Sequence, residues 1–121
     1  MGRKETGNRG EKLAQDYLKK HRHHLVETNY NCPHGEIDII SIHKGTLVFT
    51  EVRSKTGTGF GSPEESVTHA KKDKIRSSAL YYLQTHDNLP RAWRIDFIGI
   101  EMDRDGNVSR LDCIENAIGE E

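Results

Sequence analysis

The stretch GEIDIISIHKGTLVFTEVRSK, Gly35 to Lys55, sets carboxylates into two of the most apolar runs of the chain. β-Branched and other apolar residues dominate both runs, and Lys44-Gly45 between them suits a two-residue turn. The stretch therefore predicts a β-hairpin. Acids inside its strands need a reason other than packing, because burying a charge is costly unless the charge is paired.

Counting outward from the predicted turn brings the acids face to face. Asp38 opposes Glu51 and Glu36 opposes Arg53, all on one face because strand side chains alternate. Like charges opposed across a ladder are unfavourable, and partial burial raises the pKa of one carboxylate unless a cation lies between them. A divalent ion such as Mg²⁺, which prefers oxygen ligands, suits that position. Lys55 shares this face, which adds positive charge suited to phosphate.

Further elements surround the hairpin. Apolar residues recur with helical spacing from about residue 9 to 20, and Glu11 lies at the edge of that stripe, where it can point inward. A capping box at Ser62 predicts a second helix that runs, with a break allowed, to about Gln84, and spacing by four places Lys71 on its inward side. Residues 93–100 and 108–114 predict two more strands. The predicted order is helix, strand, strand, helix, strand, strand, an α/β or α+β sheet covered by helices.

The composition bounds the rest. With 121 residues, 33% hydrophobic and 31% charged, the chain is expected to form one domain, 1–121, with a small core and a solvated surface. It has no run approaching the ~20 apolar residues of a membrane span and no secretory signal, so we expect a cytoplasmic protein. Residues 1–76 carry 14 Lys and Arg against 10 Asp and Glu, so a basic portion is available to meet a polyanion.

Two local motifs point to less specific roles. The segment TGTGFGSP, Thr56 to Pro63, is a glycine-rich loop without the Lys-Ser/Thr ending of a phosphate loop, which argues against nucleotide binding by this loop. The segment HRHH places His21, His23 and His24 where the first helix ends. Because no nearby residue completes a metal-ligand set, we interpret these histidines as structural or surface residues.

Five segments in order resemble the YraN family of bacterial predicted endonucleases over nearly the entire chain: RGEKLAQDYL, GEIDII, LVFTEVRSK, FGSPEESV and WRIDFI. That family is similar to the Holliday-junction resolvases of the PD-(D/E)XK nuclease superfamily. Each segment alone is a weak signal, whereas five at family spacing are specific. The resemblance implies a restriction-endonuclease-like fold of three layers, with a mixed central β-sheet flanked by helices. It also implies metal-dependent hydrolysis of phosphodiester bonds in nucleic acid, with DNA the expected substrate and Mg²⁺ or Mn²⁺ the cofactor.

The resemblance further implies roles for particular residues. Asp38 matches the superfamily's motif aspartate, and Glu51-Val52-Arg53 matches its acid-x-lysine triplet. Glu11 matches a first-helix glutamate that approaches the metal, so the three acids are the expected metal ligands and, with the arginine, the expected catalytic residues. Lys71 matches a lysine of the helix after the glycine loop. The residues expected to contact nucleic acid are Arg53, Lys55 and Lys71.

One departure from the superfamily pattern leaves two functions open. Where lysine is usual, this chain has Arg53, whose pKa of about 12.5 or above prevents it from serving as a base. Arg53 can still orient a phosphate, Lys55 or Lys71 can supply an ammonium group, and a metal can activate the water. The alternative is a catalytically inactive nucleic-acid-binding protein that keeps the nuclease fold. A homodimer would suit symmetric cutting of two strands, although the sequence identifies no apolar patch for it.

Plainer roles are open to the same residues. Asp38 and Glu51 could form an acid pair at an exposed sheet edge, and Arg53 could form a surface ion pair with Glu36. Glu11 could simply be an acid near the start of the helix that the helix dipole stabilises. A lysine such as Lys71 more often extends its stem over apolar surface than acts in catalysis. The positions of these side chains in the fold distinguish the two sets of roles.

Overall fold

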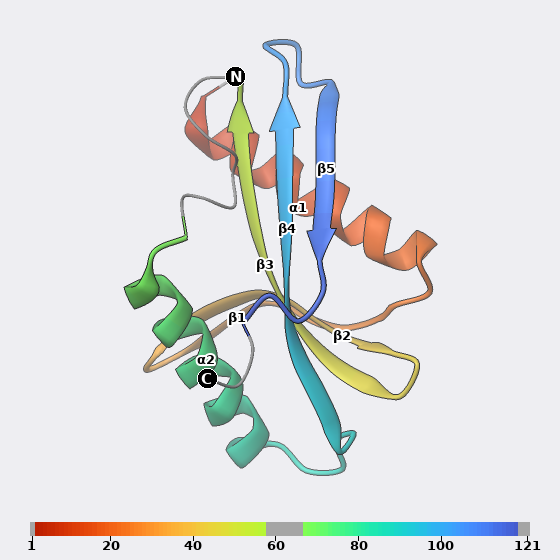
Figure 1. Ribbon diagram of the computed structural model, residues 1–121, viewed down its shortest axis with the longest axis vertical. Helices are drawn as coiled ribbons and strands as arrows, with labels where there is room; N and C mark the ends of the chain where they lie inside the picture. The colour runs from red at the N-terminus through yellow and green to blue at the C-terminus, as the bar shows by residue number, and fades with distance from the viewer. Residues whose placement is uncertain (1, 58–66, 119–121) are drawn as a thin grey trace.

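The computed structural model describes residues 2–57 and 67–118, which form two helices and a five-stranded mixed sheet (Figure 1). In chain order the elements are α1 (Arg3–Lys20), β1 (His24–Cys32), β2 (Gly35–His43), β3 (Thr46–Thr56), α2 (His69–Thr85), β4 (Ala92–Met102) and β5 (Val108–Ile114). The strands lie side by side in the same order as in the sequence, and β3 and β4 are parallel while the other neighbours are antiparallel. The predicted mixed sheet with helical cover is confirmed.

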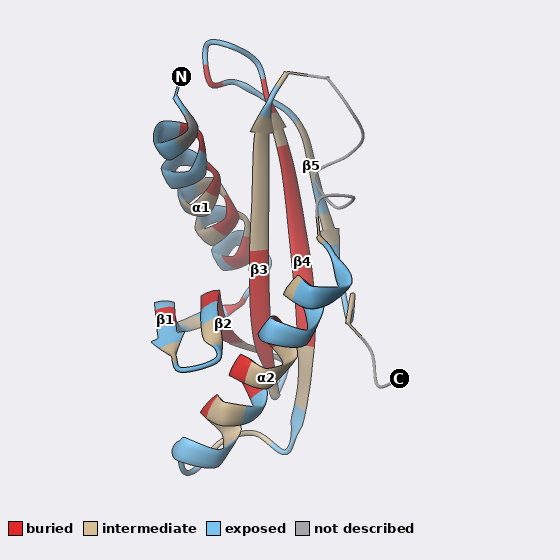
Figure 2. Ribbon diagram, turned by 90° about the vertical axis from the view of Figure 1, so that its left-hand side faces the viewer, coloured by how far each residue is buried: buried red, intermediate tan, exposed pale blue. Residues whose placement is uncertain are grey.

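The two helices cover opposite faces of the sheet and form two hydrophobic clusters (Figure 2). On one face Ala14 and Leu18 of α1 pack with Ile98 of β4. On the other face Tyr82 of α2 packs with Ile95, three residues earlier on β4, because strand side chains alternate. Burying each large apolar side chain stabilises the fold by about 1.5–3 kcal/mol. The sheet is therefore the middle of three layers.

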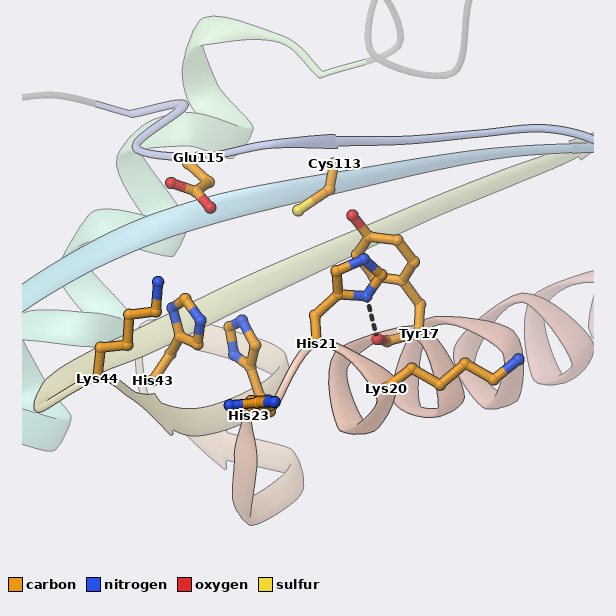
Figure 3. A pocket seen from close by; sticks show the side chains of 9 residues that line it. Tyr17, Lys20, His21, His23, His43, Lys44, Cys113 and Glu115 are labelled. Atoms are coloured by element: carbon orange, nitrogen blue, oxygen red, sulfur yellow. Dashed lines mark hydrogen bonds between the residues drawn. The ribbon is translucent and has the colours of Figure 1, made fainter.

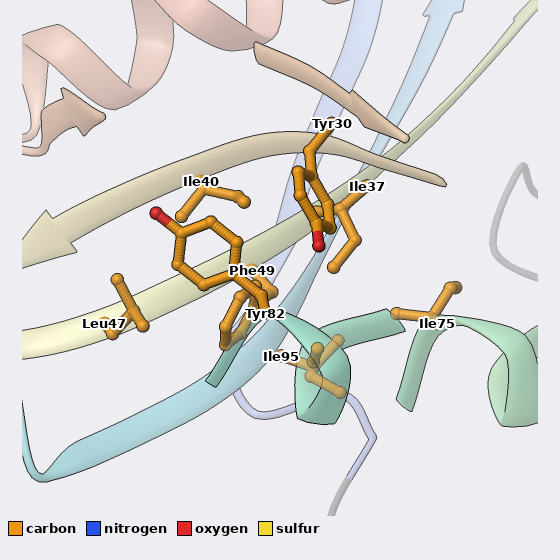
Figure 4. Packing of buried hydrophobic residues seen from close by; sticks show 9 residues of the cluster. Tyr30, Ile37, Ile40, Leu47, Phe49, Ile75, Tyr82 and Ile95 are labelled. Atoms are coloured by element: carbon orange, nitrogen blue, oxygen red, sulfur yellow. The ribbon is translucent and has the colours of Figure 1, made fainter. Parts of the chain in front are cut away.

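Aromatic packing joins α2 to the sheet (Figure 4). The rings of Phe49 and Tyr82 meet edge to face, with centroids 5.7 Å apart and planes at 79°. Tyr30 of β1 meets the same tyrosine edge to face at 5.1 Å. These contacts attach α2 to the half of the sheet that contains β1 and β2, and leave the far half of β3 to pack against α1.

None of the helices among the described residues is long and apolar enough to span a membrane.

Strand β1 and the first turns of α1 are not predicted by the sequence patterns. In β1 only Tyr30 is buried, because the strand lies at the edge of the sheet, so its sequence lacks the alternation of a half-buried strand. Helix α1 begins at Arg3 rather than near residue 9. Its early turns are held by tertiary contacts: the Thr6 hydroxyl lies 3.0 Å from the Thr56 hydroxyl at the end of β3.

The second described helix also begins later than predicted. The capping box at Ser62 lies outside the described residues, and α2 starts at His69 with Thr68 as its N-cap. The Lys71 backbone N–H donates to the Thr68 hydroxyl at 3.3 Å, which satisfies one of the helix's unpaired N–H groups. Lys71 is half-buried one turn before the buried Ile75, so it lies on the inward side of α2 as predicted.

The hairpin forms in the predicted register near its turn and opens farther from it. Ile40 pairs with Phe49 and Ile42 with Leu47, as predicted. The ladder ends at Ile39 and Thr50, so the predicted backbone pairings of Asp38 with Glu51 and of Glu36 with Arg53 do not form. Strand β3 instead continues beside β4 as far as the pair Thr56–Met102. We call this opening, residues 36–39 of β2 and 50–53 of β3, the fork.

Candidate functional site

Asp38 lies where β2 leaves β3, and its side chain replaces the backbone partner that β2 no longer provides. The Val52 N–H donates to Asp38 Oδ2 at 2.8 Å. Strict alternation of side chains also breaks here, because Ile37 packs in the cluster beneath α2 whereas Ile39 packs in the cluster beneath α1. Asp38 as a residue is only 9% exposed. Burial raises the pKa of Asp38 above its usual range, and the hydrogen bond from Val52 opposes that rise.

Glu51 brings a second buried carboxyl group to the fork. It is the last buried residue of β3 before the strand becomes half-buried. Burial, followed by repulsion from Asp38, raises the pKa of Glu51 to about 8, and the guanidinium of Arg53 opposes this rise. Arg53 Nη2 lies 3.6 Å from Glu51 Oε1. The carboxyls of Asp38 and Glu51 are close enough to share a proton, so the two residues meet although their backbones do not pair.

Glu11 reaches the same place from helix α1. Burial raises the pKa of its carboxyl group, and the charge of Asp38 and a hydrogen bond to it raise that pKa further. We refer to Glu11, Asp38 and Glu51 together as the acid cluster. Its members come from α1, β2 and β3, so only the folded chain brings them together.

Gly10 allows α1 to approach β3 closely enough for Glu11 to reach the fork. A Cβ atom at Gly10 would lie 2.5 Å from the Ser54 hydroxyl oxygen and 2.7 Å from its Cβ, distances that real Cβ atoms essentially never show. The Ser54 hydroxyl also donates to the Thr6 carbonyl at 3.3 Å across the same contact. Sequence reasoning missed Gly10, because helix periodicity treats a glycine as a weak helix former and does not identify its neighbour.

The basic residues predicted for the site are placed less uniformly. Arg53 lies beside the acid cluster, and its Nε is buried without a hydrogen-bond partner in the described part of the chain. Lys55 lies farther along β3, with its ammonium 3.8 Å from Glu101 Oε1. Lys71 lies in the first turn of α2, and within residues 2–57 and 67–118 no contact joins it to the acid cluster.

The donor set of the acid cluster suits a hard divalent cation in charge and in chemistry. Carboxylate oxygens are the ligands that Mg²⁺ and Mn²⁺ prefer, and Mg²⁺ commonly takes one or two carboxylates while keeping several waters. Burial is the larger cause of the raised pKa values and repulsion from Asp38 the next, and a cation would relieve the repulsion. Across the described ranges no three His, Cys, Asp or Glu residues are grouped tightly enough to form a complete set of ligands. A cation here would thus rest on two close carboxyls, with the third within reach.

The arrangement of the sheet and helices identifies the class of fold. A mixed five-stranded sheet with a helix on each face is the α+β arrangement of a restriction-endonuclease-like fold, as the sequence predicts. Comparison with known proteins then identifies the family. The model of "Uncharacterised protein family UPF0102" matches residues 10–100, and the chain belongs to this family. This is the YraN family whose motifs the sequence resembles.

Curated relatives support the assignment over nearly the whole chain. A UPF0102 protein of Dehalococcoides mccartyi is 45% identical over 119 residues, which cover 98% of this chain and 97% of the relative. A UPF0102 protein of Desulforamulus reducens is 41% identical over 118 residues, covering 96% and 97%. A third, of Persephonella marina, is 44% identical over 94 residues, covering 78% and 81%. The first two alignments include every residue range that contributes to the fork.

Proposed function

We propose that the protein is a metal-dependent nuclease that hydrolyses phosphodiester bonds in DNA, with Mg²⁺ or Mn²⁺ as cofactor. The observation that carries the proposal is the convergence at the fork of three acids from separate elements beside an arginine with an unpaired buried donor. Burying like charges side by side destabilises a fold. A bound cation would explain why these acids are present despite that cost.

The acid cluster would hold the cation through Asp38 and Glu51, with Glu11 completing the set directly or through a water. The Val52 N–H, which donates to Asp38 Oδ2 at 2.8 Å, holds this carboxyl in place. A bound divalent ion would supply Lewis-acid stabilisation of the phosphate and a nucleophilic water near neutral pH. No side chain of the cluster then has to act as the base. The reaction would therefore tolerate arginine at the position where lysine is usual.

Arg53 would position the scissile phosphate. A guanidinium presents its donors in a fork that matches two phosphate oxygens, and its charge is permanent at any working pH. Its Nη2 already faces Glu51, while its buried Nε has no partner in the described residues and would reach an anionic oxygen once the side chain turns outward. Such a donor stabilises negative charge as it develops on the phosphate.

The alternative function is DNA binding without cleavage. The arginine in the triplet favours it, as does the incomplete grouping of the acids within the described ranges. A binder would keep the basic residues for phosphate and use the acids only within the fold. Selectivity for branched DNA and assembly as a homodimer are finer parts of the nuclease proposal, and the substrate panel below tests the first of them.

One assay separates the two functions. The protein is incubated with four-way-junction, flap and linear DNA in Mg²⁺, in Mn²⁺ and in EDTA, and the products are resolved by electrophoresis. The nuclease proposal expects cleavage only with metal, and stronger cleavage of the branched substrates if selectivity for structure holds. Tight binding with every substrate intact across metals and pH would favour the binder.

A matched pair on α1 controls this assay. Glu11→Gln removes a proposed ligand, whereas Asp16→Asn removes an exposed acid from the same helix, one whose ion pair among the described residues is with Lys12 at 3.7 Å. The first variant should lose cleavage and the second should keep it. Equal activity of the two variants would remove Glu11 from the site.

A further inference from the structure

A pocket lies away from the fork, at the far end of the elements that build it. It has a volume of about 470 Å³, which is within the range of small-ligand sites. The C-terminal end of α1, the turn between β2 and β3 and the end of β5 enclose it (Figure 3). We call it the histidine pocket, and its lining residues are Tyr17, Lys20, His21, Arg22, His23, His43, Lys44, Cys113 and Glu115.

The lining of the histidine pocket is predominantly basic. Lys20, Arg22 and Lys44 are cations, and Glu115 is the one acid among the lining residues. His23 is neutral near pH 7, because burial lowers its pKa to about 4. With three permanent cations against one acid, an anion is the ligand that the pocket's charge favours.

Two of these cations occupy backbone positions that ordinarily suit glycine or asparagine. Arg22 has a φ of 66° just past the end of α1, where bonds from His23 N to the Leu18 carbonyl and from Arg22 N to the Lys19 carbonyl form a Schellman motif. Lys44 has a φ of 50° in the turn before Gly45. A long side chain is strained in this left-handed conformation. Local folding therefore does not explain why both positions are basic, whereas a shared ligand would.

The rings of the pocket add donors and a stacking surface. Tyr17 and His21 are stacked with centroids 4.0 Å apart, and His23 and His43 are stacked at 4.2 Å with planes at 5°. His43 Nδ1 lies 3.3 Å from Arg94 Nη2, which can only donate, so Nδ1 is the acceptor. The Nε2 nitrogen therefore carries a proton and is a further hydrogen-bond donor.

A soft metal is a weaker candidate for this pocket. Burial raises the pKa of the Cys113 thiol to about 11, so the thiolate that a metal needs is scarce near pH 7. Within residues 2–57 and 67–118 no three His, Cys, Asp or Glu residues are grouped so as to hold an ion. The cations around the rim would also repel one.

We propose that the histidine pocket binds a phosphate group carried by a nucleotide or a nucleic-acid strand. Lys20, Arg22 and Lys44 neutralise the phosphate, and the stacked pair of Tyr17 and His21 offers a face to the attached base. His21 lies ten positions after Glu11, about 15 Å at the helical rise, so this site is separate from the acid cluster. The proposal does not depend on whether the acid cluster hydrolyses anything.

The test is a binding titration in EDTA, so that the acid cluster plays no part through metal. Histidine ring resonances of the full chain are followed by NMR as inorganic phosphate, adenosine monophosphate or a short single-stranded oligonucleotide is added. We expect shifts at His21 and His43. If the monophosphate saturates at least as readily as the oligonucleotide, the ligand is a free nucleotide; if the oligonucleotide binds more tightly, it is a strand.

Variants at the strained positions separate binding from folding. Arg22→Gly and Lys44→Asn should each weaken phosphate binding about tenfold, the scale of one lost charged contact. Both should leave the melting temperature unchanged or raise it, because the new residue suits the backbone. Lys19→Gln removes a charge from the same turn of α1 without touching the pocket, and Asn88→Gly changes a left-handed residue elsewhere, with a φ of 59°. Both controls should bind as wild type.

Two results would overturn the proposal. One is an absence of any shift at His21 and His43 with all three ligands. The other is wild-type affinity in Arg22→Gly and Lys44→Asn, since binding would then occur elsewhere. Because neither readout uses cleavage or metal, failure here leaves the nuclease proposal standing, and a failed cleavage assay leaves the histidine pocket standing.

Discussion

The fork and the histidine pocket share α1, β2 and β3 but gather opposite charges by different means. At the fork, acids lie inside the fold, where desolvation and repulsion raise their pKa values. At the histidine pocket, exposed cations lie at the end of α1 and in the β2–β3 turn, and Arg22 and Lys44 carry strain in the backbone. Both sites contain features that destabilise the fold: buried like charges at the fork, and left-handed backbone at long side chains in the histidine pocket. The first depends on pH and metal, whereas the second depends on which residue occupies the turn.

The largest expected effect separates the fork from the rest of the molecule. Glu51→Gln should reduce cleavage by at least about 10²–10³-fold, the scale of removing one electrostatic group from an active site, while DNA affinity stays close to wild type. Arg53→Lys should retain or increase cleavage, and Arg53→Ala should lose it. Rates come from initial velocities on the best substrate, and affinities from titration in EDTA. A fully active Glu51→Gln protein would end the metal-site interpretation.

Metal should stabilise the protein through the fork alone. Saturating Mg²⁺ or Mn²⁺ should raise the melting temperature by roughly 5–10 °C, because an ion that binds only the folded state stabilises it by mass action. Asp38→Asn keeps an acceptor for the Val52 N–H but removes a charge, so it should abolish the metal response while leaving metal-free stability unchanged or higher. The same response in wild type and variant would place the ion elsewhere.

The metal-free protein should lose stability as the pH rises from 6.5 to 8. Glu51 has a folded pKa of about 8, above its value in the unfolded chain, so its stabilising contribution is complete at low pH and disappears as the pH passes through 8. The loss should be on the order of 1–3 kcal/mol. His23, with a pKa lowered to about 4, acts below pH 6.5 instead, where stability falls as the pH falls.

Denaturant unfolding in EDTA at several pH values measures this slope. Glu51→Gln should flatten it between pH 6.5 and 8, because the titrating group is gone. A slope that persists in the variant would assign the titration to another residue.

The smallest effect tests whether the fork depends on the close approach of α1. Gly10→Ala should destabilise the protein by about 1–2 kcal/mol, because a clash with Ser54 outweighs the gain in helix propensity. Gly7→Ala, which meets nothing within 4 Å in the same helix, should instead stabilise it by about 0.5–1 kcal/mol. Adding Ser54→Gly should relieve much of the Gly10→Ala penalty. Equal effects of the two alanines would remove the steric role of Gly10.

Where the sequence prediction failed, the missing information was long-range. Strand β1 has one buried residue and is held by pairing with β2, so no local sequence pattern predicts it. The pairing of Asp38 with Glu51 was wrong as a backbone register but right as a meeting of side chains, because β2 leaves β3 one residue before that pair. The histidines at the end of α1 were interpreted as structural or surface residues, since His43 joins His23 only through the sheet.

The sequence by itself determined the features that depend on neighbours along the chain. Alternating apolar residues specified the strands of the hairpin, Lys44-Gly45 specified its turn, and the motif order specified the family. Tertiary structure alone decided where β2 separates from β3, how near Glu11 comes to Asp38, and which cations surround one pocket. The physical reason is that periodicity and turn propensity act over a few residues, whereas burial, desolvation and steric approach depend on side chains that only folding brings together.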